Sequence, residues 1–258
     1  MNTSLKTLLA TCALMTAATA ATAAPIISIS GNGSLVGAQT AETTFLSYLV
    51  GPSVVENFDG MGTAPTPTGT TNNSWENKST LGKFTTAVGT FQLNSPGQYL
   101  GNAENTQLLI ESTRTGEDGR EILASNAKDF WLDSNDAKVV TWTLGAPLTG
   151  AFNAFGFYLA DPSDQGAKLT LYYTDGTSWT SDNVLPGKAN ASVYYVSVVS
   201  EKSVVGGQFI FNNNGNNHDG WGIDDIVVGH VSVPEPSTLI LMGLGLLGLG
   251  AARRRTAA

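Results

Sequence analysis

Apolar and polar side chains alternate along short stretches in the second half of the chain. Val140, Trp142 and Leu144 are separated by single residues, and successive side chains of a strand point to opposite faces. The pattern recurs at Phe155–Leu159, Leu169–Tyr173, Tyr194–Val198, Phe209–Phe211 and Trp221–Val228. Many short strands separated by turn residues predict a mainly β fold, a two-sheet antiparallel β-sandwich.

The first half contains one stretch with helical periodicity, Thr40 to Leu49. Thr40 is suited to cap its N-terminus, and the negative charge of Glu42 in the first turn favours the helix dipole. The predicted apolar face holds Phe45, Leu46 and Leu49. Gly51-Pro52 ends the pattern, so the sequence predicts one short N-terminal helix.

Short extended stretches surround this helix. Ile26–Ile29 is predicted as a first strand and Val54–Asp59 as the strand after the helix, followed by a loop rich in Pro, Gly, Thr and Asn from Gly60 to Asn73. Further short strands, whose pairing the sequence leaves open, are marked by Phe84, by Phe91 with Leu93, and by Leu108–Ile110.

Asp175-Gly176 lies between two strand-like stretches and predicts a two-residue type I′ hairpin turn. This turn pairs Tyr172 with Trp179 on the face away from Leu171. Two neighbouring aromatic rings on an outward face are a candidate carbohydrate-binding platform. The alternative is a cross-strand aromatic pair that stabilises the hairpin by about 0.2–1 kcal/mol.

The C-terminal segment 233–258 has a different pattern. A Pro-Glu-Pro triplet (Pro234, Glu235, Pro236) precedes an uncharged apolar run, Leu239–Ala252, and the run ends in Arg253, Arg254 and Arg255. About 14 helical residues span roughly 21 Å, less than the ~30 Å hydrocarbon core of a bilayer. Arginines next to an apolar run stay on the cytoplasmic side, so the preceding chain is expected outside.

Triplet, apolar run and arginine cluster in this order resemble the PEP-CTERM sorting signal of exported Gram-negative proteins. The resemblance implies recognition by an exosortase-type membrane protease, which cuts near Pro-Glu-Pro and releases or transfers the protein. It also implies association with extracellular polysaccharide and only transient residence of the C-terminal helix in the inner membrane.

The N-terminus predicts export independently. Lys6 supplies a positive region, Leu8–Ala18 an apolar region, and Ala21-Thr22-Ala23 a small-x-small cleavage site. The alternative is a lipoprotein signal with a lipid attached to Cys12. Thr11 argues against this alternative, because it is the wrong residue just before a lipidated cysteine. The predicted organisation is a signal peptide at 1–23, a β-sandwich domain at 24–232 and the sorting signal at 233–258.

Composition then excludes several functions for the predicted domain. Cys12 is the only cysteine and leaves with the signal peptide, which excludes thiol nucleophiles, thiolate metal sites and disulfides. Without the two terminal signals, 9 of 13 basic and 20 of 21 acidic residues remain, a formal charge near −11. Such a charge repels nucleic acid and anionic lipid and attracts divalent cations.

The stretch Asn212–Asp225 is the best candidate for a metal. Alternation from Trp221 places Asp225 in an apolar row, unless a β-bulge between Asp224 and Asp225 resets the alternation. A carboxylate there needs a partner. Backbone N–H groups are one choice, and a structural Ca²⁺ held by Asp219, Asp224 and Asp225 is the other.

No residue set predicts an enzyme. His218 and His230 are interpreted as solvated, and no Gly-x-Ser-x-Gly elbow occurs. The order of helix and strands, closing with Asp219–Ile226, resembles the jelly-roll, lectin-like cargo domains of PEP-CTERM proteins. We therefore expect a non-enzymatic cell-surface or extracellular-matrix protein with a carbohydrate-binding role. The alternatives are a secreted polysaccharide hydrolase and a purely structural matrix or adhesion protein.

Overall fold

The computed structural model describes residues 23–61, 77–78, 82–96, 108–112, 130–134, 137–145, 152–162, 167–182, 192–211 and 220–233. Residues 24–232 form one compact unit, and residues 1–23 with 233–258 form another. Of the second unit only Ala23 and Val233 are described, so the predicted signal peptide and sorting residues lie outside the described ranges. Among the described helices, none is long and apolar enough to span a bilayer.

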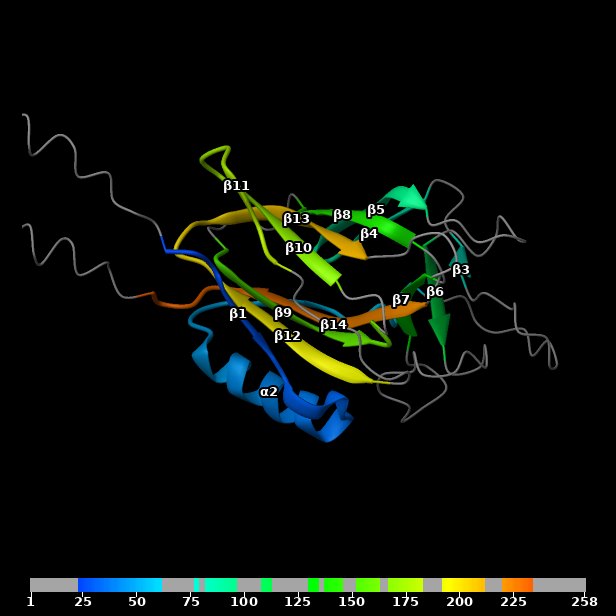
Figure 1. Ribbon diagram of the computed structural model, residues 1–258, viewed down its shortest axis with the longest axis horizontal. Helices are drawn as coiled ribbons and strands as arrows, with labels where there is room; N and C mark the ends of the chain where they lie inside the picture. The colour runs from blue at the N-terminus through cyan, green and yellow to red at the C-terminus, as the bar shows by residue number, and fades with distance from the viewer. Residues whose placement is uncertain are drawn as a thin grey trace, which may run out of the picture. The chain divides into compact units, whose positions relative to one another are not determined.

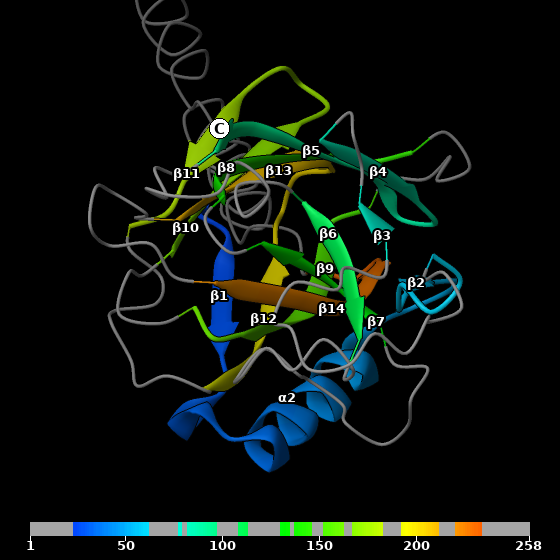
Figure 2. The same cartoon turned by 90° about the vertical axis from the view of Figure 1, so that its right-hand side faces the viewer.

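Two antiparallel sheets form the domain, as predicted (Figures 1 and 2). The larger sheet has the order β1-β12-β9-β14-β7-β6-β3, with β2 also paired to β14. Its strands are β1 (Ile26–Ile29), β2 (Val54–Glu56), β3 (Asn77–Lys78), β6 (Leu109–Ser112), β7 (Phe130–Ser134), β9 (Ala154–Ala160), β12 (Val193–Val199) and β14 (Trp221–Gly229).

The smaller sheet has the order β11-β10-β13-β8-β5-β4. Its strands are β4 (Lys83–Thr86), β5 (Gly89–Pro96), β8 (Ala137–Thr143), β10 (Ala167–Tyr173), β11 (Ser178–Thr180) and β13 (Val204–Phe211). The strands marked by Phe84 and Phe91 therefore pair with each other, which the sequence had left open.

The core between the sheets consists of the alternating apolar residues. Trp142 of β8 is 1% exposed, and its ring lies 5.0 Å from that of Phe155 in β9. Phe157 meets Phe209 of β13 edge to face at 5.3 Å. Trp142 also donates its indole N–H to the carbonyl of Val88 at 3.1 Å, so its one polar group is satisfied.

The helix is longer than the sequence predicted. It is α2 (Leu35–Tyr48), preceded by a short 3₁₀ turn, η1 (Gly31–Gly33). Ser34 is its N-cap and accepts a hydrogen bond from the N–H of Gly37 at 3.2 Å. Thr40, the predicted cap, lies inside the helix and donates to the carbonyl of Val36. Leu46, predicted on the buried face, is 40% exposed.

The strand after the helix is shorter than predicted. β2 ends at Glu56 because Phe58 has a positive φ of 57°, which turns the chain away from the sheet. The Glu56 carboxylate stabilises this turn by accepting hydrogen bonds from the backbone N–H groups of Phe58 at 2.8 Å and Ala87 at 2.6 Å. Phe58 is thereby buried in the core rather than placed in a strand.

Candidate functional site

Helix α2 covers the outer face of the larger sheet, which we call the helix-covered face. Phe45 of α2 packs there beside Tyr195 of β12, with ring centroids 6.0 Å apart. Tyr195 is opposite Tyr158 of β9, which in turn is opposite Asp224 of β14. The face thus carries polar groups beneath the helix, unlike the apolar core between the sheets.

A hydrogen bond fixes the helix to this face. The hydroxyl of Tyr158 donates to Oε2 of Glu42 at 2.6 Å, across 116 residues of sequence. Burial and this hydrogen bond both raise the pKa of Tyr158 far above its usual value. The hydroxyl therefore stays protonated and remains a donor at neutral pH.

The neighbouring Tyr195 is buried differently. Its ring lies across Gly156, where a Cβ atom would collide with the ring. Among the described residues, its hydroxyl has no hydrogen-bond partner. Burial is the first cause that raises the pKa of Tyr195, and the charges of Glu42 and Asp225 add to it.

The β-bulge considered from the sequence is present in β14. The register against β9 shifts between Asp224 and Val227, and Asp225 has a positive φ of 45°. Oδ1 of Asp224 accepts a hydrogen bond from the N–H of Asp225 at 2.7 Å. The bulge lets residues on both sides of it face the same core: Trp221, Ile223, Ile226 and Val228.

The calcium set predicted from the sequence is only partly placed. Asp224 is 4% exposed on the helix-covered face, whereas Asp219 lies outside the described residues. The described part of the chain contains no group of three or more His, Cys, Asp or Glu side chains arranged to hold a metal ion. Calcium binding therefore remains a prediction.

The predicted aromatic platform is wrong, because the hairpin has another register. Tyr172 is opposite Ser178, and Trp179 is opposite Leu171. The connection is a three-residue loop in which only Gly176 has a positive φ, 79°, and its N–H bonds the carbonyl of Tyr173. A shift of one residue turns a side chain to the other face, so Trp179 packs against the core.

Of the remaining predicted residues, the structure describes only His230. His230 is exposed just after β14, as expected from its position. His218 and the sorting residues Pro234, Glu235, Pro236, Arg253, Arg254 and Arg255 lie outside the described ranges.

A groove of about 510 Å³ runs between β1 and α2. Ser28 and Ser197 are paired across its floor, and Thr44, Phe45 and Tyr48 line the wall that α2 provides. The volume is within the range of ligand pockets, and the lining contains both hydroxyl groups and aromatic rings. Tyr48 is 60% exposed and is accessible to a ligand.

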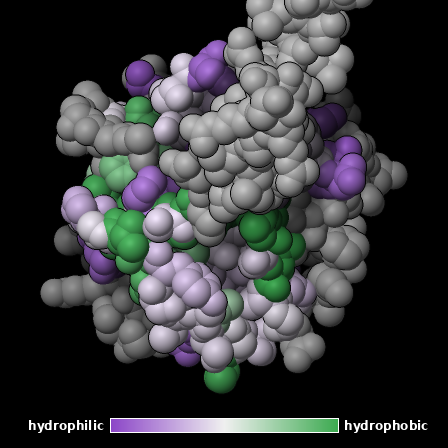
Figure 3. Space-filling view, turned by 90° about the vertical axis from the view of Figure 1, so that its left-hand side faces the viewer, coloured by the Kyte–Doolittle hydropathy of each residue, from purple (hydrophilic) through white to green (hydrophobic). Residues whose placement is uncertain are grey.

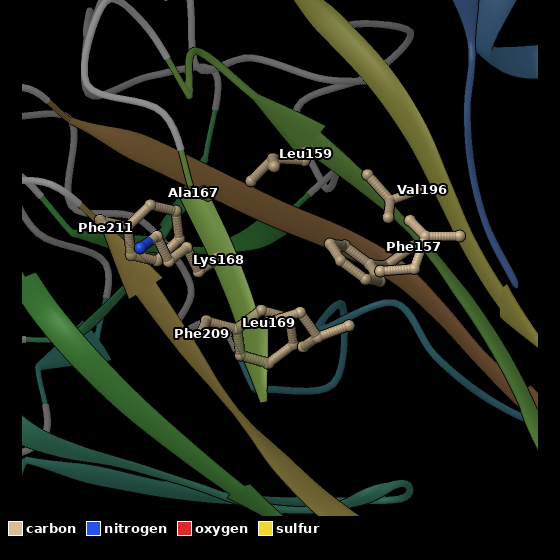
Figure 4. A pocket seen from close by; sticks show the side chains of 9 residues that line it. Phe157, Leu159, Ala167, Lys168, Leu169, Val196, Phe209 and Phe211 are labelled. Atoms are coloured by element: carbon tan, nitrogen blue, oxygen red, sulfur yellow. The ribbon is translucent and has the colours of Figure 1, made fainter. Parts of the chain in front are cut away.

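A second pocket lies between the two sheets but is too small for a ligand (Figure 4). Phe157, Leu159 and Val196 line it from one sheet, and Leu169, Phe209 and Phe211 from the other. Its volume is about 20 Å³, room for about one water molecule. An apolar lining gives such a water no partners, so this pocket is a packing gap of the core.

The sequence predictions missed the helix-covered face. Every residue of β9 is buried, including Tyr158 on the face away from Phe157. An uncharged run such as Ala154–Ala160 is typical of a strand covered on both faces, and this was the available signal.

Comparisons with known proteins identify one motif. Residues 232–255 match the PEP-CTERM protein-sorting motif, as predicted. No curated protein matches the chain. The K2 cleaved adhesin domain of Lys-gingipain (Kgp) is 14% identical with a TM-score of 0.30, covering 48% of this chain and 83% of that one.

The K3 cleaved adhesin domain of Lys-gingipain from Porphyromonas gingivalis W83 is 10% identical with a TM-score of 0.24, covering 47% and 91%. Similarity at this level carries no inference. The sorting motif, by contrast, implies export of a surface-directed, Gram-negative type of protein and processing by exosortase, a membrane protein.

Proposed function

We propose that this chain is a non-enzymatic cargo protein of the cell surface or extracellular matrix that binds extracellular polysaccharide. The observation that carries the proposal is the PEP-CTERM motif at residues 232–255, which begins at the last residue of the compact unit 24–232. Because the core lies inside that unit, the motif can be removed without removing any core residue. The arrangement is that of a folded cargo with a detachable sorting segment.

The groove between β1 and α2 is the proposed sugar site. Carbohydrates present apolar C–H faces as well as hydroxyl groups, and the groove offers both kinds of partner. Tyr48 supplies an exposed ring, and Ser28 and Ser197 supply hydroxyls on the floor. The groove replaces the Tyr172 and Trp179 platform, whose rings face opposite sides of the hairpin.

Retention of residues 24–232 on polysaccharide affinity gels and a glycan array, each with and without Ca²⁺, tests this proposal. Tyr48→Ala should lower retention, whereas Tyr172→Ala, the same change on β10 of the smaller sheet, should leave it unchanged. Equal retention of both variants and the parent on every binding glycan would refute the groove. No binding to any glycan would favour the purely structural matrix protein, and release of soluble sugar would favour a hydrolase.

Mass spectrometry of the mature protein tests the processing. The expected protein begins at Ala24 and lacks Arg253, Arg254 and Arg255. Recovery of intact Ala258 from the cell surface would contradict removal of the sorting segment.

A further inference from the structure

Both ends of the domain lie at the same end of the larger sheet (Figure 1). One row of paired residues crosses the strands there: Ile26 is opposite Val199, Val199 is opposite Ala154, and Ala154 is opposite Gly229. Ile26 follows the predicted signal-peptide cleavage site closely, and Gly229 precedes the sorting motif. We call this the tail-bearing end.

Exposed hydrophobic side chains gather at the tail-bearing end. The described residues include seven large hydrophobic side chains that are exposed. Six of them lie on elements that meet this end: Ile26, Leu46, Tyr48, Val50, Val55 and Val205. The seventh, Val36, lies at the opposite end of α2.

Backbone contacts place the elements that carry these side chains at this end of the domain. Val50 donates its N–H to the carbonyl of His230, and Leu49 forms a bridge with Val231, so the end of α2 adjoins the exit of the chain. Val205 follows Val204, whose N–H bonds the carbonyl of Phe152 just before β9. Figure 3 looks onto this end and shows green, hydrophobic atoms on its surface among polar ones. Gathered exposed apolar side chains indicate an interaction surface.

The length of the connecting chain indicates the partner. Only residues 234–238 separate Val233 from the apolar run that begins at Leu239. Five extended residues span at most about 18 Å. While the apolar run is in the membrane, the tail-bearing end is therefore held beside the lipid. A tether this short keeps the domain at an effective concentration in the millimolar range near the membrane, at which even a weak contact between this end and the lipid forms.

We propose that the tail-bearing end rests on the lipid bilayer while the sorting motif is inserted, and leaves it when exosortase cuts. This inference rests on membrane insertion of the sorting motif and does not require polysaccharide binding, although Ile26 and Tyr48 belong both to this end and to the groove. The contact is apolar rather than electrostatic. Lys202, which lies at this end, is already paired with Asp175 at 2.8 Å, and the chain carries a net charge of −8.

Environment-sensitive labels test the contact in the chain without residues 1–23, which contains no native cysteine. Val50→Cys and Val205→Cys place a nitrobenzoxadiazole label at the tail-bearing end. Val36→Cys is the matched control, since it is an exposed valine at the other end of α2, about 20 Å from Val50. Each labelled chain is reconstituted in phosphatidylcholine vesicles, with and without phosphatidylglycerol, and iodide quenching and emission wavelength are measured.

In vesicles, the labels at Val50 and Val205 should shift to the blue and lose iodide quenching, whereas the Val36 label should remain quenched. The protection should not require phosphatidylglycerol. Equal quenching at all three positions would overturn the proposal, and so would protection only with anionic lipid. Protection in detergent that increases with protein concentration would overturn it in favour of a second copy as partner. A chain that does not float with the vesicles would also overturn it, because the tether is then absent.

Discussion

Two tyrosines on the helix-covered face provide a sharp test of how α2 is held. Tyr158 and Tyr195 are opposite each other, their ring centroids are 5.1 Å apart, and both side chains are buried. Tyr158→Phe removes a hydroxyl that donates to Glu42 at 2.6 Å. Tyr195→Phe removes a hydroxyl for which the described residues offer no partner. The two substitutions are chemically identical and differ only in that hydrogen bond.

The expected magnitudes follow from this difference. A hydrogen bond to a charged group contributes about 1.5–3 kcal/mol to stability. Glu42 is only partly buried, so water can replace the lost donor, and we expect Tyr158→Phe to lower the free energy of unfolding by about 1.5 kcal/mol. A buried hydroxyl without a partner costs desolvation energy, so Tyr195→Phe should be neutral or stabilising by up to about 1 kcal/mol.

Urea unfolding of residues 24–232 at neutral pH, followed by tryptophan fluorescence, measures both values. A double-mutant cycle with Glu42→Ala isolates the pair, and Tyr158→Phe should cost almost nothing in the Glu42→Ala background. An equal loss of stability for Tyr158→Phe and Tyr195→Phe would refute the argument. A coupling energy below about 0.5 kcal/mol would do the same.

Three further predictions follow from single positions. Gly156→Ala should destabilise the domain by about 1–3 kcal/mol, because the new Cβ collides with the ring of Tyr195; an unchanged melting temperature would contradict this. Trp179→Ala should cost about 2 kcal/mol in urea unfolding, roughly half the loss for a fully buried tryptophan. The loss should exceed that of Tyr172→Ala, since of the two only Trp179 packs on the core, and a larger loss for Tyr172→Ala would contradict this packing. A hydrogen bond from Lys202 holds the pKa of Asp175 below its usual range. The ionised Asp175 therefore stabilises the folded domain at any pH above the unfolded pKa of about 3.9, and this stabilisation is lost as the pH falls through the pKa of the folded state. Asp175→Asn should therefore lower the melting temperature at neutral pH but not in strong acid, and a pH-independent difference would contradict the assignment.

The β-sandwich was predictable because strand alternation records which face each side chain occupies. Phe155 and Phe157 were predicted on one face, and both are buried between the sheets. The bulge near Asp224 was also among the alternatives, since an aspartate in an apolar row requires either a partner for its carboxylate or a bulge that resets the alternation of the strand. Helix ends were less predictable, because Ser34 and Thr40 both carry a capping hydroxyl and the choice between them depends on where the preceding chain is held.

The PEP-CTERM segment can be recognised without a fold, because Pro-Glu-Pro, the apolar run and the arginines are adjacent in the chain and the signal consists of their order. The sequence by itself therefore determined that the chain carries a sorting signal. It also indicated a turn at Asp175-Gly176 but not its length, and that length set which face Trp179 occupies.

Only the tertiary structure decided the sites. The groove joins β1 to α2, the Tyr158 hydrogen bond spans 116 residues, and the tail-bearing end collects valines from α2's end, β2 and β13. Such groupings depend on how strands pair across the sheet. Pairing is settled by the packing of the whole core, so local sequence patterns do not contain it.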